Sequence, residues 1–326
     1  MQMSQESQTP GDLFRRTFFP YAAAARERML RDQTRIVYYT SAATAMQILR
    51  NREIWMRNTQ VMNDFLEVDH GISCVQRALA TEAGRSFQSL ANTFYPNAFA
   101  EAHSQFEAWI PGLRGDTFLT CVSEHPATDD QHGRLSMWRA YGGNAGVALV
   151  LNPAVFFRPS NALAAYSMPV IYASEEGLVA ELAQVTQRLL ASPEVVGGLG
   201  YAGFKNTLFE MLRFGAVCTK HPAFSEEREW RVISSPALKT SPLLVHATET
   251  IGNVPQVVLK LPLKDKADEG LFGIEPKDFI ERILIGPCEH PYVLRRALWA
   301  ALEEAGVSDP GPRLTVTGIP LRANQR

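Results

Sequence analysis

Short apolar runs rich in β-branched and aromatic residues recur along the chain and predict strands. We expect these strands at residues 36–39, 54–58, 116–123, 146–151, 168–173, 228–234, 256–261, 282–286 and 313–321. Stretches with helical periodicity or many helix-forming residues predict helices at 21–32, 42–51, about 64–79, 98–109, 135–141, 175–191, 201–214 and 290–306. Because the strands outnumber regular strand–helix repeats, the order favours an α+β fold over a doubly wound parallel sheet.

The composition is that of an ordinary globular protein. Of the 326 residues, 46% are apolar and 20% are charged, and the net charge of -2 gives no basic footprint for nonspecific nucleic-acid binding. The sequence contains no apolar run of about 20 residues, so no membrane contact is expected. We expect residues 1–20 to be a disordered leader and residues 21–326 to form one α+β domain.

The cysteines and glycines exclude several familiar sites. The four cysteines are scattered without a Cys-x-x-Cys spacing, which predicts unbridged thiols in a cytoplasmic protein and no zinc site. No glycine-rich phosphate loop of the dinucleotide-binding or nucleoside-triphosphate type is present. The chemistry must therefore be sought among other polar residues.

Two carboxylates stand near the start of the stretch FSEEREWRVIS, residues 224–234. Glu227 and Glu229 are two residues apart, so in a strand they point to the same face. Such a pair could hold a ribose hydroxyl and stabilise a cation, or it could bind a divalent ion. Alternatively, Arg228 and Arg231 make it a salt-bridged strand edge. Glu229, beside the apolar run, is the first candidate for a catalytic carboxylate.

A second polar cluster precedes a predicted helix. Asp64 and Glu67 have the spacing of a capping box, and Asn63 or Asp64 is a natural N-cap. Capping alone accounts for two of these three residues. Asn63 and Glu67 also share one helix face, and a helix N-terminus offers N–H groups to an anion such as a pyrophosphate.

Aromatic residues form the remaining candidates. Tyr38, Tyr39 and Thr40 end a predicted strand, where one ring could stack on a base and the hydroxyl could bind a ribose. Trp138 and Tyr141 lie three residues apart on a short helix and form one patch. Core packing is the alternative explanation for all of these rings.

Several motifs together carry a resemblance to a known family. The segments VYYTSAATAMQIL, IWMRNTQVMNDFLE, LTCVSE, LSMWRAYGGNAGVAL, EEREWRVI, ERILIGP and VTGIPLR occur in this order between residues 36 and 322. This pattern resembles a bacterial domain-of-unknown-function family, number 2971. The chain departs from it at Phe65, where a proline is common.

More distantly, the chain resembles NAD-dependent ADP-ribosyltransferases, especially the DNA-modifying toxins. The resemblance lies in a strand ending in aromatic-Thr, a following helix and strand, and a late strand with a glutamate before aromatic-x-Val. It implies a mixed, largely antiparallel split sheet flanked by helices, with NAD bound as a substrate and Glu229 and Glu227 as catalytic residues. With NAD as the ligand, the candidate residues predict nucleotide contacts from Tyr38, Tyr39, Thr40, Asn63, Asp64, Glu67, Trp138, Tyr141 and Arg231.

The expected function is therefore an NAD-consuming enzyme that cleaves the nicotinamide–ribose bond, acting as a toxin or in phage defence. Its partners would be a small nucleotide and a protein, nucleic-acid or water acceptor. One alternative is a nuclease with Mg²⁺ held by Asp64, Glu67, Glu227 and Glu229. Another is a non-enzymatic sensor of a nucleotide or a phage protein.

Overall fold

The chain divides into two units, each assembled from separate stretches of sequence. The computed structural model describes residues 9–62, 67–158 and 160–320. One unit comprises residues 1–28, 63–115 and 168–225, and is called the helical unit below. The other comprises residues 29–62, 116–167 and 226–326, and is called the sheet unit.

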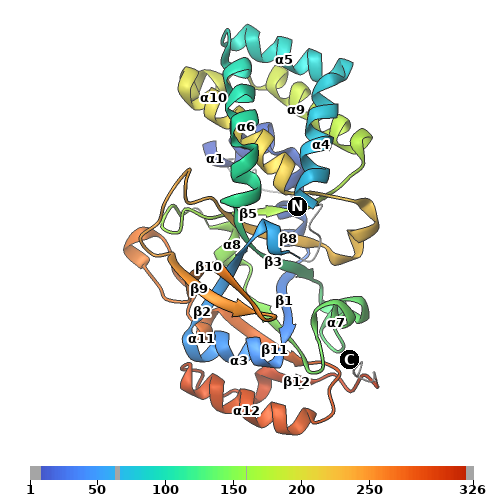
Figure 1. Ribbon diagram of the computed structural model, residues 1–326, viewed down its shortest axis with the longest axis vertical. Coiled ribbons are helices and arrows are strands. Elements are labelled where there is room, and N and C mark those ends of the chain that lie inside the picture. The colour runs from blue at the N-terminus through green and yellow to red at the C-terminus, as the bar shows by residue number, and fades with distance from the viewer. Residues whose placement is uncertain (1–8, 63–66, 159, 321–326) are drawn as a thin grey trace, which may run out of the picture. The chain divides into compact units, whose positions relative to one another are not determined.

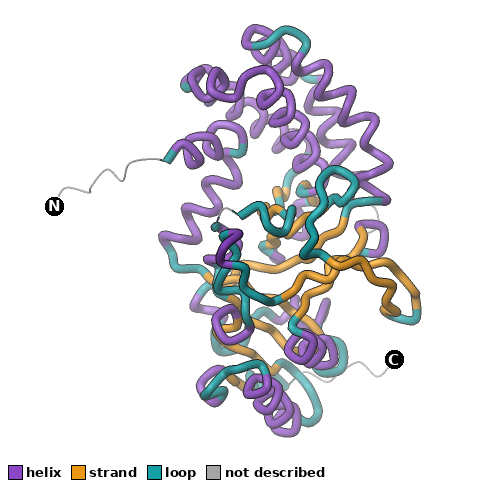
Figure 2. Tube along the Cα trace, turned by 90° about the vertical axis from the view of Figure 1, so that its left-hand side faces the viewer, coloured by secondary structure: helices purple, strands orange, loops and turns teal. Residues whose placement is uncertain are grey.

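The helical unit is a bundle (purple tube in Figure 2). Within it, α10 packs against α4 and α6, and α9 packs against α4 and α5. Two very short strands, β6 (Ile171–Tyr172) and β7 (Thr219–Lys220), pair in parallel. The helices are α1 (Pro10–Phe18), α2 (Pro20–Arg31), α4 (Glu67–Ala80), α5 (Glu82–Phe94), α6 (Ala98–Gly115), α9 (Glu175–Ala191) and α10 (Pro193–Val217).

Helix α1 differs from the expected disordered leader, which was predicted to extend through residue 20. Thr9 caps the helix by accepting a hydrogen bond from the Asp12 N–H at 3.2 Å, and Pro10 occupies the first helical position. Phe18 is buried, and its ring lies 6.2 Å from that of Phe204. Capping and aromatic packing therefore order a segment whose sequence is polar at its start.

Helix α10 consists of two helical segments separated by a kink at Gly200, whose φ is 62°. The longer segment begins at residue 201, as the sequence predicts. The shorter segment before it was not predicted, and Pro193 at its first helical position favours its start.

The sheet unit is built on a ten-stranded sheet (orange in Figure 2). The strand order is β12-β11-β4-β1-β3-β2-β10-β9, with β8 paired to β3 and to β5. Within this sheet, β11 and β12 pair in parallel. The strands are β1 (Arg35–Ser41), β2 (Glu53–Asn58), β3 (Phe118–His125), β4 (Gly146–Leu151), β5 (Tyr166–Pro169), β8 (Glu229–Ser234), β9 (Val245–Ile251), β10 (Val254–Pro262), β11 (Ile280–Ile285) and β12 (Leu314–Val316).

This arrangement confirms an α+β fold with a mixed, largely antiparallel sheet. Strand β3 pairs with β8 over residues 118–123. It also pairs with β1 at residues 123–125 and with β2 at residues 118–119. Because a strand has only two edges, β1 and β2 share the edge opposite β8, and the sheet branches there.

Helices and short turns complete the sheet unit (Figure 1). Ser41 caps α3 by accepting from the Thr44 N–H at 3.2 Å, and α3 packs on β1, β2 and β4. The helices are α3 (Ala42–Asn51), α7 (Leu135–Tyr141), α8 (Ala154–Phe157), α11 (Pro276–Phe279) and α12 (Pro291–Glu304). Single 3-10 turns are η1 (Thr59–Val61), η2 (Ala127–Asp129), η4 (Ala267–Glu269) and η5 (Gly311–Arg313).

Hydropathy along these helices gives no membrane span. Within the described residues, none of the helices combines the length and apolar character needed to cross a bilayer. The four cysteines, Cys74, Cys121, Cys218 and Cys288, all lie in the described part of the chain and form no disulfide with one another.

Candidate functional site

The stretch that carries Glu227 and Glu229 is not one continuous strand. Glu227 is the last residue of the 3-10 turn η3 (Pro222–Glu227), and β8 begins at Glu229. Arg228, between them, has a left-handed backbone with φ at 45°. The prediction that both carboxylates share a strand face is therefore wrong for Glu227, because the chain turns before the strand starts.

Glu229 and Arg231 form a buried ion pair on one face of β8. The guanidinium Nε donates to Glu229 Oε1 at 2.8 Å, and Nη2 donates to Oε2 at 3.3 Å. The two residues are 6% and 2% exposed. Such a two-point contact fixes the carboxylate in orientation as well as in position.

Tyr141 connects this pair to Glu227. Its hydroxyl donates a hydrogen bond to Glu227 Oε1 at 3.1 Å. Burial raises the pKa of Tyr141, and the nearby charges of Glu227, Glu229 and Cys121 raise it further. The phenol therefore stays protonated and remains a hydrogen-bond donor. Although the turn separates the two carboxylates along the chain, both act on this one phenol.

The segment from Arg134 to Tyr141 holds the turn that carries Glu227. The Arg134 guanidinium donates to the carbonyl of Glu226, and to that of Glu124 at 3.3 Å. The Ser136 hydroxyl donates to Glu226 Oε1 at 2.8 Å. Together with the Tyr141–Glu227 hydrogen bond, these contacts tie one segment of the chain to the consecutive residues Glu226 and Glu227. We call Arg134, Ser136 and Tyr141 the α7 clamp.

Arg134 was missed by reasoning from the sequence. It is 9% exposed, and its Nε lies 3.6 Å from Asp129 Oδ2. Its backbone N–H also donates to the Tyr39 hydroxyl at 2.9 Å. The only sequence signal is its position directly before the predicted helix, which does not distinguish it from an exposed arginine.

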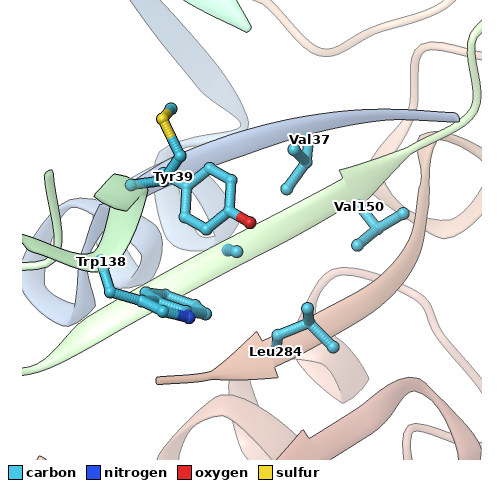
Figure 3. Packing of buried hydrophobic residues seen from close by; sticks show 7 residues of the cluster. Val37, Tyr39, Trp138, Val150 and Leu284 are labelled. Carbon is cyan, nitrogen blue, oxygen red and sulfur yellow. The ribbon is translucent and has the colours of Figure 1, made fainter. Parts of the chain in front are cut away.

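Tyr39 and Trp138 belong to the core beneath the clamp. Their rings meet edge to face with centroids 4.9 Å apart, beside Val37, Val150 and Leu284 (Figure 3). They are 6% and 2% exposed, and burial raises the pKa of Tyr39. These positions favour packing, and stacking on a ligand stays a prediction for both rings.

Gly133 is required where these two rings approach the backbone. Its φ is +64°, and an added Cβ would lie 2.8 Å from the Tyr39 hydroxyl. The Trp138 indole N–H donates to the His132 carbonyl at 2.7 Å, which fixes the ring from the same loop. The loop before α7 therefore depends on both aromatic residues.

Tyr38 and Thr40 lie on the other side of the sheet. Neighbouring residues of β1 alternate between its two faces, so these side chains point away from the face that Tyr39 occupies. Burial raises the pKa of Tyr38, whereas hydrogen bonds to the side chains of Thr120 and Thr40 lower it. The structure thus places Tyr38 and Thr40 on one face of the sheet and Tyr39 on the other.

Strands β1 and β8 share the sheet but are not neighbours. Val37 pairs with Ser123 of β3, and Ser123 pairs with Glu229 on its other edge. From the two polar clusters that they carry, the strands of Tyr39 and Glu229 were predicted to be neighbours in one sheet; this prediction is wrong, because β3 lies between them. Residues paired in this way still point to the same face.

The cluster before α4 is only partly described. Asn63 and Asp64, with the predicted cap, lie outside the described residues. Glu67 is the first residue of α4 in the helical unit, and it forms a buried ion pair with Lys220 at 3.6 Å. The same residue lines an open polar pocket of about 800 Å³ with His70 and His221.

Among the described residues, no group of three or more His, Cys, Asp and Glu side chains is arranged to hold a metal ion.

The family described as "Protein of unknown function (DUF2971)" matches residues 137–232, which include most of α7 and the start of β8. No curated protein and no solved structure gives a significant match to the chain.

Proposed function

We propose that the face of the sheet unit bearing Glu227, Glu229, Arg231 and Tyr141 is the active site of an NAD-consuming enzyme of the ADP-ribosyltransferase kind. The observation that carries the proposal is the Tyr141–Glu227 hydrogen bond beside the buried Glu229–Arg231 pair. Two carboxylates held in place next to one phenol are suited to stabilising positive charge that develops in a transition state.

The reaction breaks the bond between the nicotinamide nitrogen and C1′ of the ribose. The electron pair goes to the nitrogen, so the pyridinium leaves as neutral nicotinamide and the positive charge passes to C1′ and the ring oxygen. Water or an acceptor hydroxyl then bonds to C1′ and releases a proton to a carboxylate. Only interactions that strengthen as this charge develops accelerate the step.

The two carboxylates have different roles in this proposal. Glu227 is half-buried and contacts the substrate ribose, with Tyr141 holding its orientation. Glu229 is buried and bound at two points by Arg231, so it acts as a fixed negative charge behind the site. The order of importance expected from the sequence, with Glu229 first, is reversed here because Glu229 is the less accessible of the two.

The test measures NAD consumption by the full chain and by Glu227→Gln at matched melting temperature. Glutamine keeps the shape and one acceptor but removes the charge, and loss of such a group lowers the rate by about 10²–10³. The control is Glu281→Gln, an exposed carboxylate on β11 of the same unit, which should keep full activity. Toxicity on expression is a second readout.

Two results would overturn the proposal. The first is a wild-type protein that neither binds nor consumes NAD. The second is a Glu227→Gln variant with unchanged turnover. Activity on nucleic acid that is lost with a chelator would instead support the nuclease alternative, and NAD binding without turnover would support a sensor.

A further inference from the structure

The core of the helical unit contains an apolar cavity of about 100 Å³. Helices α1, α2, α4, α5, α9 and α10 all contribute to its lining. Apolar side chains form nearly all of the wall, among them Phe18, Val75, Phe87, Leu208 and Phe214. An apolar cavity can take up a small apolar molecule.

One carboxyl group, that of Glu181, stands in this wall. It occupies the same stripe of α9 as Leu178 and Val185, at spacings of three and four residues. Its Oε1 accepts a hydrogen bond from the Tyr21 N–H at 2.9 Å. Burial raises the pKa of Glu181, and the Tyr21 hydrogen bond opposes this only in part.

The half-buried carboxyl group of Glu181 has few polar partners. The described part of the chain gives Glu181 one hydrogen bond, from a neutral backbone donor, and no ion pair. Burial of a polar group without enough partners is unfavourable. A donor supplied by a bound molecule would relieve this penalty while its apolar part fills the cavity.

We propose that this cavity binds a small molecule with one apolar ring and one O–H or N–H donor, of the phenol type, with the donor directed at Glu181. The volume limits the ligand to a single ring, because the cavity of about 100 Å³ is smaller than the engineered cavity of about 150 Å³ that binds benzene, and wall side chains must move to admit the ring. The lining sets the chemistry, because the wall is apolar apart from this one acceptor. The proposal is independent of the reaction assigned to the sheet unit.

Partly exposed side chains offer a way in. Tyr21, Leu182 and Met211 line the cavity and are neither fully buried nor fully exposed. Met168, another partly exposed lining residue, has the same flexible thioether side chain as Met211. Rotamer changes at these positions can therefore admit a ring without unfolding the bundle.

The experiment titrates the full chain with phenol and with toluene, which has a similar ring but no donor. Methyl-labelled methionine reports on Met168 and Met211 by NMR. We expect saturable shifts of both methyl signals with phenol, and a rise in melting temperature of about 2 °C or more at ten times the half-saturating concentration. Glu181→Leu should weaken phenol binding at least tenfold and leave toluene binding within twofold.

A cavity-filling variant separates specific binding from general solvent effects. Ala22→Leu places a larger side chain in the wall and should abolish the response to both molecules. Ala24→Leu, at an exposed position of the same helix, is the matched control and should keep it. If Ala22→Leu does not fold, Leu182→Phe at the rim serves the same purpose.

Three outcomes would overturn the inference. One is the absence of a saturable response to phenol up to its solubility limit. Another is an unchanged response in a folded cavity-filling variant. The third is equal affinity for phenol and toluene in the wild type, which would remove the role assigned to Glu181.

Discussion

Glu229 in the sheet unit is a buried carboxyl group and Glu181 in the helical unit is a half-buried one, and their surroundings differ. Glu229 faces a guanidinium that binds both of its oxygens. Glu181 faces apolar side chains and one backbone N–H. Burial alone therefore does not determine what a carboxyl group does, because its partners decide whether the charge is retained.

The difference extends to the packing around each group. In the sheet unit, the α7 clamp and the Glu229–Arg231 pair fill the space with directed hydrogen bonds, which hold side chains in one arrangement. In the helical unit, the space beside Glu181 is an apolar cavity. The sheet unit therefore contains fixed charges, and the helical unit contains unfilled apolar space.

The largest effect should come from breaking the buried ion pair. Arg231→Met removes the two-point partner of Glu229, whose carboxylate then stays buried without its main counter-charge. Loss of one partner of a buried pair lowers the free energy of unfolding by about 3–5 kcal/mol. Urea denaturation measures this directly.

A double variant is the control for this prediction. Replacing both partners, in Glu229→Gln with Arg231→Met, removes the buried charge and should recover at least half of the lost stability. If the double variant is as unstable as Arg231→Met alone, the loss comes from the changed shape of the side chains and not from the unpaired charge of Glu229. The contrast between the partners of Glu229 and those of Glu181 would then not explain stability.

A smaller loss is expected from the α7 clamp. Arg134→Met removes the donors to the carbonyls of Glu226 and Glu124. Charge-assisted hydrogen bonds contribute about 1.5–3 kcal/mol, so the free energy of unfolding should fall by about 2 kcal/mol. The turn of Glu227 should also exchange its amide hydrogens faster. Arg139→Met, at an exposed position on the same helix, should change stability by less than about 0.5 kcal/mol.

The main elements of the fold could be predicted from the sequence because they follow its periodicity. Strand β4 is buried throughout and appears as a continuous apolar run. Strand β9 could not be found in this way, since its exposed and half-buried residues include His246, Thr248 and Glu249. The hairpin turn at Gly252 and Asn253, both with positive φ, was the available signal for it.

The candidate site could be predicted only as a set of residue types. The sequence identifies Glu227, Glu229 and Tyr141, and the structure brings all three together. It does not identify Arg134, because an arginine is normally exposed and its burial depends on contacts between distant segments. It also misplaces Glu227, because the left-handed turn at Arg228 has no glycine to mark it.

Glu181→Gln should raise the free energy of unfolding, whereas Arg231→Met should lower it. Glu181→Gln keeps an acceptor for the Tyr21 N–H but removes the charge that burial disfavours. The folded pKa lies above the ordinary value of 4.5, so the wild-type carboxyl contributes stability below that pH and loses it as pH rises through the folded pKa. Near neutral pH the variant should therefore be more stable, by about 1 kcal/mol.

The pH dependence is the control for Glu181→Gln. Below pH 4.5 both proteins carry a neutral group at this position, and their free energies of unfolding should agree. A variant that is less stable than the wild type at neutral pH would show that the Glu181 charge is well compensated in the folded protein.

The smallest effect should come from Asp12, a partly exposed carboxyl group that provides a reference for Glu229 and Glu181. The Thr9 hydroxyl and the Arg15 guanidinium lower the pKa of Asp12 from 3.8 to about 2. Its side chain is 36% exposed, so water and salt screen the interaction. Asp12→Asn should lower the free energy of unfolding by about 0.5 kcal/mol at neutral pH. Because the folded pKa is lowered, this stabilisation is present above pH 3.8 and is lost as pH falls through about 2.

Urea denaturation of the wild type and Asp12→Asn at low salt and in 1 M NaCl, at about pH 7, measures the difference in the free energy of unfolding. High salt should reduce the difference, whereas a loss comparable to that of Arg231→Met would mean that solvent exposure does not explain the contrast between these carboxyl groups.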